Sequence, residues 1–535
     1  MSPKHILSLV SIFLLVGITN AQSVSQEVVK AKAPINWFNL DQKEDNILGI
    51  STEKAYREIL QRKKSRPVVV AVIDSGVDTN HEDLQGKIWT NPKEIAGNGQ
   101  DDDKNGYVDD LNGWDFIGGK DGKDVIYDSM ELTRQLAQLG KRFDGKIEAD
   151  IQATDKADFL RYRSIKEWYE KKYNETKKLF EPYKEIREVF HLATEILQQK
   201  AGLKEITLEN VKKVQSDDDK VKYAKQVLEY YLAEGITQKD LDDGYEELSA
   251  QLEYGYNLEY DSRSIVGDNY ADLTEKGYGN NEVTGPDAMH GTHVSGIIGA
   301  NRANEIGIKG ICDNVKIMAI RVVPNGDERD KDVANGIRYA VDNGAQIINM
   351  SFGKSVSPNK EVVDAAVKYA ESKGVLLVHA AGNDSEDLDT KPNFPTQKMA
   401  DGSSVSNWIE VGNSSWQEGP QAVNESSNYG RESVDIFAPG SDIYSTTPKS
   451  TYESHSGTSM AAPVVAGAAA LLMSYFPNLT AVQVKKILLE TAVKPKMKVY
   501  KPGSDDEIDF GKLSRTGGIV NIYEAVKKAE SFTKN

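Results

Sequence analysis

Residues 68–76 read VVVAVIDSG, a continuous apolar run that ends on an aspartate, a serine and a glycine. An uninterrupted apolar run rich in valine is typical of a strand in the middle of a parallel sheet, where both faces are covered. In such sheets the active crevice lies beyond the carboxyl ends of the strands. The run therefore predicts a central strand that carries Asp74 at the functional edge of the sheet.

After residue 290 the sequence alternates between helical and extended patterns. The expected elements, in chain order, are a strand at 316–323, a helix at 331–341, a strand at 345–352, a helix at 360–372, a strand at 375–380 and a helix at 459–475. This order predicts an α/β fold built on a doubly wound parallel sheet. Ser351 and Asn383 lie at the ends of two of the strands, so we expect them at the same edge as Asp74.

The pattern changes between residues 123 and 263, where glycines are few and Pro182 is the single proline. Apolar residues recur there at three- and four-residue spacing, which predicts amphipathic helices at 165–173, 180–197 and 221–232. A partly disordered linker is the alternative, but the aromatic stripes favour ordered helices. We therefore expect a helical insertion at 123–263 that divides the sheet domain into the segments 47–122 and 264–535.

The first 21 residues have a cationic start, an apolar stretch at 6–18 and a small residue, Ala21, at their end. This pattern predicts a cleaved secretory signal peptide. A membrane anchor is the alternative, but a span needs about 20 apolar residues and this stretch is shorter. A short N-terminal segment, 22–46, follows. We expect an exported protein, in the periplasm, on the cell surface or secreted.

The composition excludes several classes of partner. A formal charge of −17 disfavours nucleic acid and anionic membrane surfaces. The apolar segment 460–473 contains Pro463 and Gly467, which suits a buried core helix better than a membrane span. Cys312 is the only cysteine, so an internal disulfide cannot form and the thiol is expected to pack as a small hydrophobic side chain.

Three short blocks carry the chemistry. Asp74 lies in VIDSGVD at 72–78, His290 begins HGTHVSG at 290–296, and Ser459 lies in GTSMAAP at 457–463. Each residue alone has a structural explanation: a hydrogen-bond acceptor, a core histidine and a helix N-cap. Their occurrence in the order Asp, His, Ser matches one known order of a nucleophilic triad.

In all three blocks the chain resembles the subtilase family of serine peptidases, over residues 47–119 and from 255 onward. The resemblance implies a serine endopeptidase that hydrolyses peptide bonds through an acyl-enzyme intermediate, with Asp74, His290 and Ser459 as its triad. A serine hydroxyl is a poor nucleophile at neutral pH, so Ser459 needs His290 as a base. Asp74 would orient the imidazole and stabilise its protonated form.

The resemblance also implies roles for three segments that lie at strand ends. Asn383 resembles the oxyanion-loop asparagine, which would act together with the Ser459 backbone N–H. Ser351, Phe352 and Gly353 resemble the substrate strand, whose backbone pairs with an extended peptide. Ala380, Ala381 and Gly382 would form the wall of the primary pocket, with residues 393–395 near its floor. Polypeptides are therefore the expected substrates, and the oligomeric state is left open.

The acidic loop 101–110, DDDKNGYVDD, is similar to a calcium-binding EF-hand loop. The spacing assigns the ligand oxygens to Asp101, Asp103, Asn105 and Asp109. The match is partial because Asn112 stands where a bidentate glutamate is expected, unless Asp110 substitutes for it. A structural Ca²⁺ is the favoured interpretation, a solvated turn is the alternative, and no cofactor is expected for catalysis.

Two features depart from the family pattern. Segment 22–46 is too short for the family's chaperone domain, and Val464 replaces a histidine that usually follows the proline of the serine block. A catalytically silent binding protein that acts through the helical insertion is the alternative function, but its signature, a lost triad residue, is absent. An esterase would need a G-x-S-x-G motif. We hypothesise that the insertion covers the cleft or assists folding.

Overall fold

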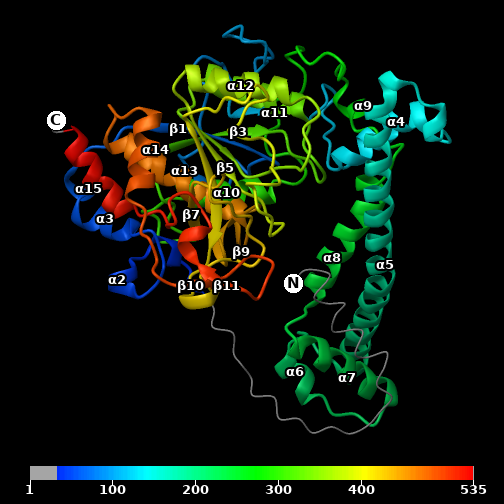
Figure 1. Cartoon of the computed structure of the whole chain (residues 1–535). Coiled ribbons are helices and arrows are strands. Elements are labelled where there is room, and N and C mark those ends of the chain that lie inside the picture. The colour runs from blue at the N-terminus through cyan, green and yellow to red at the C-terminus, as the bar shows by residue number, and fades with distance from the viewer. Residues whose placement is uncertain (1–32, 534–535) are drawn as a thin grey trace. The chain divides into compact units, whose positions relative to one another are not determined.

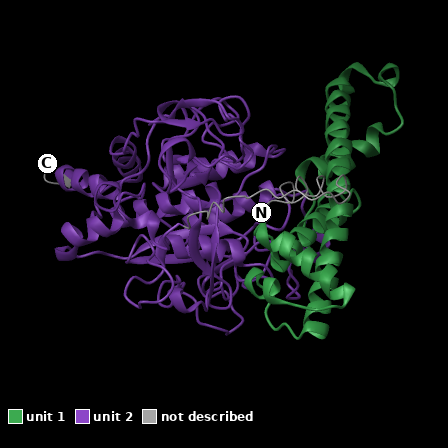
Figure 2. Cartoon of the chain, turned by 90° about the horizontal axis from the view of Figure 1, so that it is seen from below, with its two compact units in different colours: residues 1–29, 127–261 green, residues 30–126, 262–535 purple. Residues whose placement is uncertain are grey.

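The computed structural model describes residues 33–533, and the predicted signal peptide and the start of segment 22–46 lie outside this range. The described chain divides into two compact units, 33–126 with 262–533, and 127–261. They are coloured separately in Figure 2 and are described one at a time below. The larger unit contains the predicted sheet, and the smaller unit is helical.

A seven-stranded sheet in the order β2-β3-β1-β4-β5-β6-β7 forms the centre of the larger unit, and all of its strand pairs are parallel. Its strands are β1 Val68–Asp74, β2 Gly113–Asp115, β3 Val315–Arg321, β4 Ile347–Met350, β5 Leu376–Ala380, β6 Trp408–Ser414 and β7 Ile436–Pro439. The predicted α/β fold is thereby confirmed. The VVVAVI run forms a central strand, because β1 pairs with β3 on one side and β4 on the other.

Helices cover both faces of this sheet (Figure 1). Val68, Val70 and Val72 of β1 pack in one core with helices α10 and α13, whereas Ala71 and Ile73 pack in a second core with α11 and α12. The continuous apolar run is explained by this alternation, since successive strand residues face opposite sides. The helices span α10 Met289–Gly299, α11 Asp330–Asp342, α12 Lys360–Ser372 and α13 Thr458–Tyr475.

Smaller elements complete this unit. The antiparallel hairpins pair β8 Ile443–Thr447 with β9 Thr451–His455, and β10 Lys498–Tyr500 with β11 Glu507–Asp509. The remaining α-helices of this unit are α2 Gln42–Asp45, α3 Thr52–Glu58, α9 Arg263–Val266, α14 Ala481–Glu490 and α15 Ile522–Thr533.

Helix α13 is the one helix in residues 33–533 with the length and composition of a membrane span, yet 89% of its apolar window is buried inside the protein. Such burial is the setting of a core helix.

The smaller unit is built along a single long helix, α5 Lys156–Ala201, which continues through Pro182. Near its start, α5 packs with α4 through Phe143, Phe159 and Tyr162. Farther along, Tyr183, Phe190 and Leu197 form a second small core with α6, α7 and α8. The bounds of these helices are α4 Glu131–Phe143, α6 Leu208–Lys213, α7 Asp219–Ala233 and α8 Gln238–Ala250.

Candidate functional site

The predicted site residues lie at the edge of the sheet where its parallel strands have their carboxyl ends. Asp74 is the last residue of β1, and residues 351–353 and 381–383 directly follow β4 and β5. His290 and Ser459 are each the second residue of a helix, α10 and α13 respectively. The topology thus accounts for the side chains at this edge, because parallel strands end together and the helices that follow begin there.

Asp74 and His290 are joined by a short hydrogen bond. Asp74 is buried, and its Oδ1 lies 2.7 Å from His290 Nδ1. The same oxygen accepts the Ser75 N–H at 2.8 Å. Burial lowers the pKa of His290, but the Asp74 charge and hydrogen bond outweigh this effect, so the pKa is raised above its usual value of 6.5. The imidazole therefore donates from Nδ1 and leaves its Nε2 lone pair available.

Ser459 is bonded to the segment that follows β4. Its Oγ donates to the Ser351 carbonyl at 3.0 Å, and Ser351 Oγ donates to the Ser459 carbonyl at 2.9 Å. In residues 33–533 no hydrogen bond joins Ser459 Oγ to His290, so the hydroxyl rests against the strand end in this structure. The backbone N–H of Ser459 lies in the first turn of α13, where N–H groups have no partner within the helix.

The side-chain amide of Asn383 is oriented by Thr458. Its Oδ1 accepts the Thr458 N–H at 2.8 Å and the Thr458 hydroxyl at 3.1 Å, which leaves the Nδ2 hydrogens to face elsewhere. A Cβ built on Gly457 would lie 3.4 Å from Asn383 Nδ2 and 3.7 Å from Ser459 N. Both donors therefore border one small space beside Gly457. Thr458, directly beside the predicted nucleophile, was not among the predicted site residues.

The two predicted substrate segments converge on Asn393. A Cβ added to Gly353 would lie 2.4 Å from Asn393 Nδ2, and one added to Gly382 would lie 3.2 Å from the same atom. Asn393 Nδ2 donates to the Ala380 carbonyl at 3.2 Å. The segments 351–353 and 380–382 thus approach the same amide from two sides. Neighbouring Ala381 is buried, and its carbonyl accepts a hydrogen bond from the Asn428 side chain.

The acidic loop brings together a different set of carboxylates from the predicted one. Asp101 and Asp103 lie with Glu94, and one oxygen of each falls within 4.8 Å of the others. Asp109 is not part of this cluster, and its two oxygens accept the N–H groups of Asn98 and Gly99. The Asn105 side-chain amide is hydrogen-bonded within the loop: its Nδ2 donates to Asp110, and its Oδ1 accepts from the Tyr107 N–H. Glu94 was missed because it lies outside the loop motif.

Comparison with known proteins identifies relatives of this chain. A model of the subtilase family matches residues 65–516. Over 216 residues the chain is 41% identical to thermitase from Thermoactinomyces vulgaris, which covers 39% of this chain and 72% of that protein. Over 240 residues it is 37% identical to subtilisin DY from Bacillus licheniformis, which covers 44% of this chain and 77% of the relative.

Solved structures of proteases are also similar. A protease structure from Pseudoalteromonas arctica gives a TM-score of 0.46 at 21% identity, covering 91% of this chain and 96% of that one. A cold adapted subtilisin-like serine proteinase gives a TM-score of 0.36 at 31% identity, covering 43% and 76%.

Proposed function

This chain belongs to the subtilase family and is a serine-type endopeptidase, and we propose that Asp74, His290 and Ser459 form its catalytic triad. The observation that carries this assignment is the 2.7 Å hydrogen bond between Asp74 Oδ1 and His290 Nδ1. It joins residues that are 216 positions apart in the sequence, at the edge of the sheet where α13 presents Ser459.

His290 acts as the general base in this proposal. Because its Nδ1–H is donated to Asp74, the Nε2 lone pair takes the proton from Ser459 as the hydroxyl attacks the substrate carbonyl. Asp74 stays ionised and stabilises the imidazolium that forms. His290 then gives the proton to the leaving amine, and water repeats the sequence to release the acyl group.

Substrate binding triggers the approach of Ser459 to His290. An extended peptide paired along 351–353 would present an N–H to the Ser351 carbonyl, which is the acceptor that Ser459 Oγ uses at rest. Loss of this resting bond frees the hydroxyl to turn toward His290 Nε2. Catalytic hydrogen bonds in free enzymes are often long and tighten only in the substrate complex.

Asn383 Nδ2 and the Ser459 N–H stabilise the oxyanion of the tetrahedral intermediate. The two donors border the same space beside Gly457, and Thr458 fixes the direction of the Asn383 amide. A donor that is held in place before the reaction requires no reorganisation when negative charge develops on the carbonyl oxygen.

A structural Ca²⁺ fits the cluster of Glu94, Asp101 and Asp103. Carboxylate oxygens are preferred calcium ligands, and Glu94 Oε2 is buried without a hydrogen-bond partner among the described residues. A cation there would satisfy this acceptor. Because Cys312 is the single cysteine, an ion rather than a disulfide would stabilise the loop. The ion would take no part in bond cleavage.

We place the enzyme outside the cytoplasm, on the support of the signal-like pattern at 1–21. Its substrates would be unfolded chains or exposed loops, because only extended segments can pair along 351–353. The helical insertion is proposed to restrict access to the cleft or to assist folding.

The assignment is tested by labelling with a fluorophosphonate, mapping the modified peptide by mass spectrometry, and measuring casein hydrolysis by the wild type and Ser459→Ala. We expect labelling at Ser459 and a loss of about 10⁶-fold in turnover for the variant. Labelling elsewhere, or equal turnover by the variant, contradicts the triad. A folded wild type that takes no label and hydrolyses nothing would instead support the silent binding protein.

A further inference from the structure

A buried histidine and glutamate lie next to the proposed substrate segment. His379 of β5 is fully buried and Glu410 of β6 is nearly so. Glu410 Oε1 lies 2.8 Å from His379 Nδ1, and Trp408 Nε1 donates to Glu410 Oε2 at 2.7 Å. The other ring nitrogen, His379 Nε2, lies 2.8 Å from the carbonyl oxygen of Phe352. An unbroken hydrogen-bonded chain therefore runs from β6 to the middle of the segment 351–353.

The partners at the two ends of this chain fix where its protons lie. A carbonyl oxygen only accepts, so His379 Nε2 must carry a hydrogen, and an indole N–H only donates, so Glu410 Oε2 must accept. One proton then remains between His379 Nδ1 and Glu410 Oε1. The pair is either imidazolium with carboxylate or neutral imidazole with carboxylic acid, and every polar atom in the chain is bonded in both forms.

Beyond the last backbone pair of β4 and β5, the His379 side chain supplies the hydrogen bond to the segment 351–353. The β4–β5 pairing ends at Met350 opposite His379, and two residues later the Phe352 carbonyl is bonded to the His379 ring. Successive carbonyls of an extended segment point to opposite sides. The neighbouring carbonyl of Ser351 accepts from Ser459 Oγ, so the orientation of Phe352 also determines how Ser351 faces the nucleophile.

We propose that His379, held by Glu410, is a positioning residue that keeps the segment 351–353 aligned for pairing with the substrate backbone. The inference rests on the proposed role of 351–353 in substrate binding. His379 touches neither substrate nor the reacting atoms. It acts through the Phe352 carbonyl.

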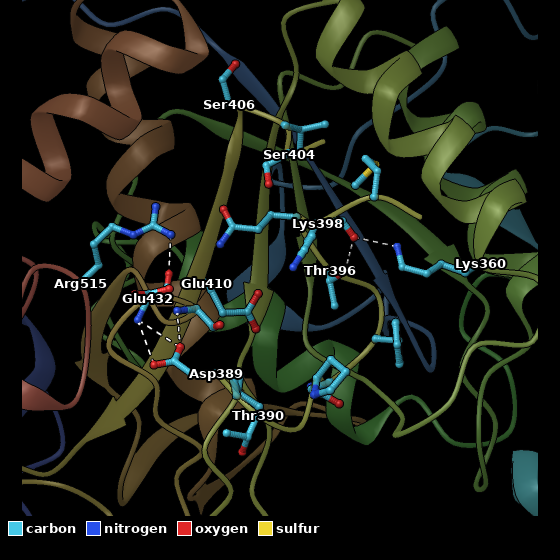
Figure 3. Close-up of a pocket in the computed structure, with 18 of the residues that line it drawn as sticks. Lys360, Asp389, Thr390, Thr396, Lys398, Ser404, Ser406, Glu410, Glu432 and Arg515 are labelled. Atoms are coloured by element: carbon cyan, nitrogen blue, oxygen red, sulfur yellow. Dashed lines mark hydrogen bonds between the residues drawn. The ribbon is translucent and has the colours of Figure 1, made fainter. Parts of the chain in front are cut away.

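The charged residues around Glu410 have other partners, so the Glu410 carboxylate remains bonded to His379 and Trp408. Glu410, Lys485 and Arg515 line a cavity of about 770 Å³, and Figure 3 shows Glu410 and Arg515 among its lining residues. Both cations interact with Asp435 of the segment next to β7, at 3.6 Å and 3.0 Å. Asp435 Oδ2 in turn accepts the Glu410 backbone N–H at 3.1 Å. Lys485 and Arg515 are therefore paired with Asp435, and Lys360 on the same cavity wall is paired with Asp364. The carboxylate oxygens of Glu410 are bonded to His379 and Trp408.

The test compares two substrates in the full-length enzyme. One is a tetrapeptide anilide long enough to pair along 351–353, and the other is a single-residue ester that lacks most of that backbone. For His379→Ala we expect kcat/KM for the tetrapeptide to fall about tenfold or more, mainly through KM, because a buried carbonyl loses its donor and the segment shifts. Turnover of the ester should change by less than about threefold, since Asp74, His290 and Ser459 are retained.

Variants at Glu410 separate positioning from simple loss of stability. Glu410→Gln can donate to neutral His379 Nδ1 and accept from Trp408, so it should keep most of the tetrapeptide activity. Glu410→Leu can do neither and should behave like His379→Ala. If His379→Ala does not fold, His379→Leu, which also lacks a hydrogen-bond donor but fills more of the buried space, is compared in its place.

His81→Ala is the matched control, because His81 is also fully buried and its Nε2 also lies against a carbonyl, that of Thr451. It should lower thermal stability without changing the ratio of tetrapeptide to ester activity. The proposal is overturned if the position-379 variant lowers both activities equally, or if Glu410→Gln and Glu410→Leu are alike. If Ser459→Ala cleaves the tetrapeptide as fast as the wild type does, the proposed function is overturned instead.

Discussion

Thr458 holds the carbonyl end of the Asn383 amide, so one neighbouring residue decides which way the proposed oxyanion donor points. Replacing Asn383 with Ala removes the donor that faces the developing charge. We expect kcat to fall about 10²- to 10³-fold with little change in KM, because the interaction forms only in the transition state. Steady-state kinetics on a peptide anilide measure both constants.

Asn383→Asp is the control for this prediction. The carboxylate keeps two acceptors for the Thr458 N–H and hydroxyl but has no hydrogen to donate. The local structure should persist while the activity is lost. Near-normal kcat in either variant would show that Asn383 does not stabilise the oxyanion.

The raised pKa of His290 determines the acid limb of the pH–rate profile. Only the neutral imidazole can act as base, so kcat/KM should fall as the pH decreases through a midpoint above 6.5. Asp74→Asn removes the charge that raises this pKa, so the midpoint should move to lower pH while kcat falls about 10⁴-fold. A wild-type optimum near pH 4 would contradict the mechanism.

Protonation of His290, which lowers activity, is expected to increase the stability of the folded state. A group whose pKa is raised in the folded state stabilises that state when protonated, fully below the unfolded value of about 6.5, and this contribution is lost as the pH rises through the folded pKa. His290 therefore adds stability on the acid side, where activity is lost. Circular dichroism melts across this range distinguish inactivation by protonation from unfolding.

Site residues that lie inside contiguous motifs could be predicted from the sequence. Site residues that are brought together only by long-range contacts could not. Asp74, His290 and Ser459 each lie inside a block of several diagnostic residues. Glu94 lies outside the acidic loop motif, and its proximity to Asp103 depends on how the loop folds back. The hydrogen bond between Glu410 and His379 likewise forms only because β5 and β6 are neighbours in the sheet.

At the scale of a single loop, calcium removal is expected to destabilise the protein. EDTA should lower the melting temperature of the wild type, because a ligand that binds only the folded state stabilises it. Glu94→Gln and Asp103→Asn each remove one ligand charge and should lower the melting temperature while making it insensitive to EDTA. Differential scanning calorimetry at fixed protein concentration measures both effects. An identical melting temperature with EDTA and with added Ca²⁺ rules out the site.

Elements with a clear period were predictable, and irregular ones were not. Helix α12 has the predicted bounds, 360–372, because its apolar stripe is regular. β6 was missed, since WIEVGNS carries polar residues that are buried through specific partners such as Trp408 with Glu410. The strand predicted at 345–352 spans Ile347–Met350, and the Ser351 carbonyl that follows it accepts the hydroxyl of Ser459. Helix α5 was predicted as two pieces, 165–173 and 180–197, yet it runs without interruption from Lys156 to Ala201.

At the scale of the whole molecule, the helical unit should be removable. Its ends lie together, since Met130 N donates to the Gly255 carbonyl and the rings of Tyr127 and Tyr254 stack at 4.4 Å. Among the described residues, none from 127–261 belongs to the two cores that flank the sheet. Replacing 129–260 with a short Gly-Ser linker should leave Ser459 reactive toward fluorophosphonate and shift the melting temperature by less than about 5 °C.

The same deletion tests what the insertion does. If it restricts access to the cleft, casein turnover should rise relative to turnover of a small peptide. If it assists folding, the yield of labelled enzyme after refolding should fall. Unchanged folding yield and unchanged turnover of both substrates would contradict both hypotheses.

The position of β1 between β3 and β4 also determines the order of events during synthesis. Its partner β3 is translated 247 residues later, because Val68 pairs with Val315, and at roughly 5 to 20 residues per second this takes tens of seconds. The helical unit, whose contacts are local, can fold in that interval while the VVVAVI strand waits unpaired and prone to aggregation. The proposed triad therefore cannot assemble before translation has passed Ser459, so the nascent chain has no proposed active site while β1 is unpaired.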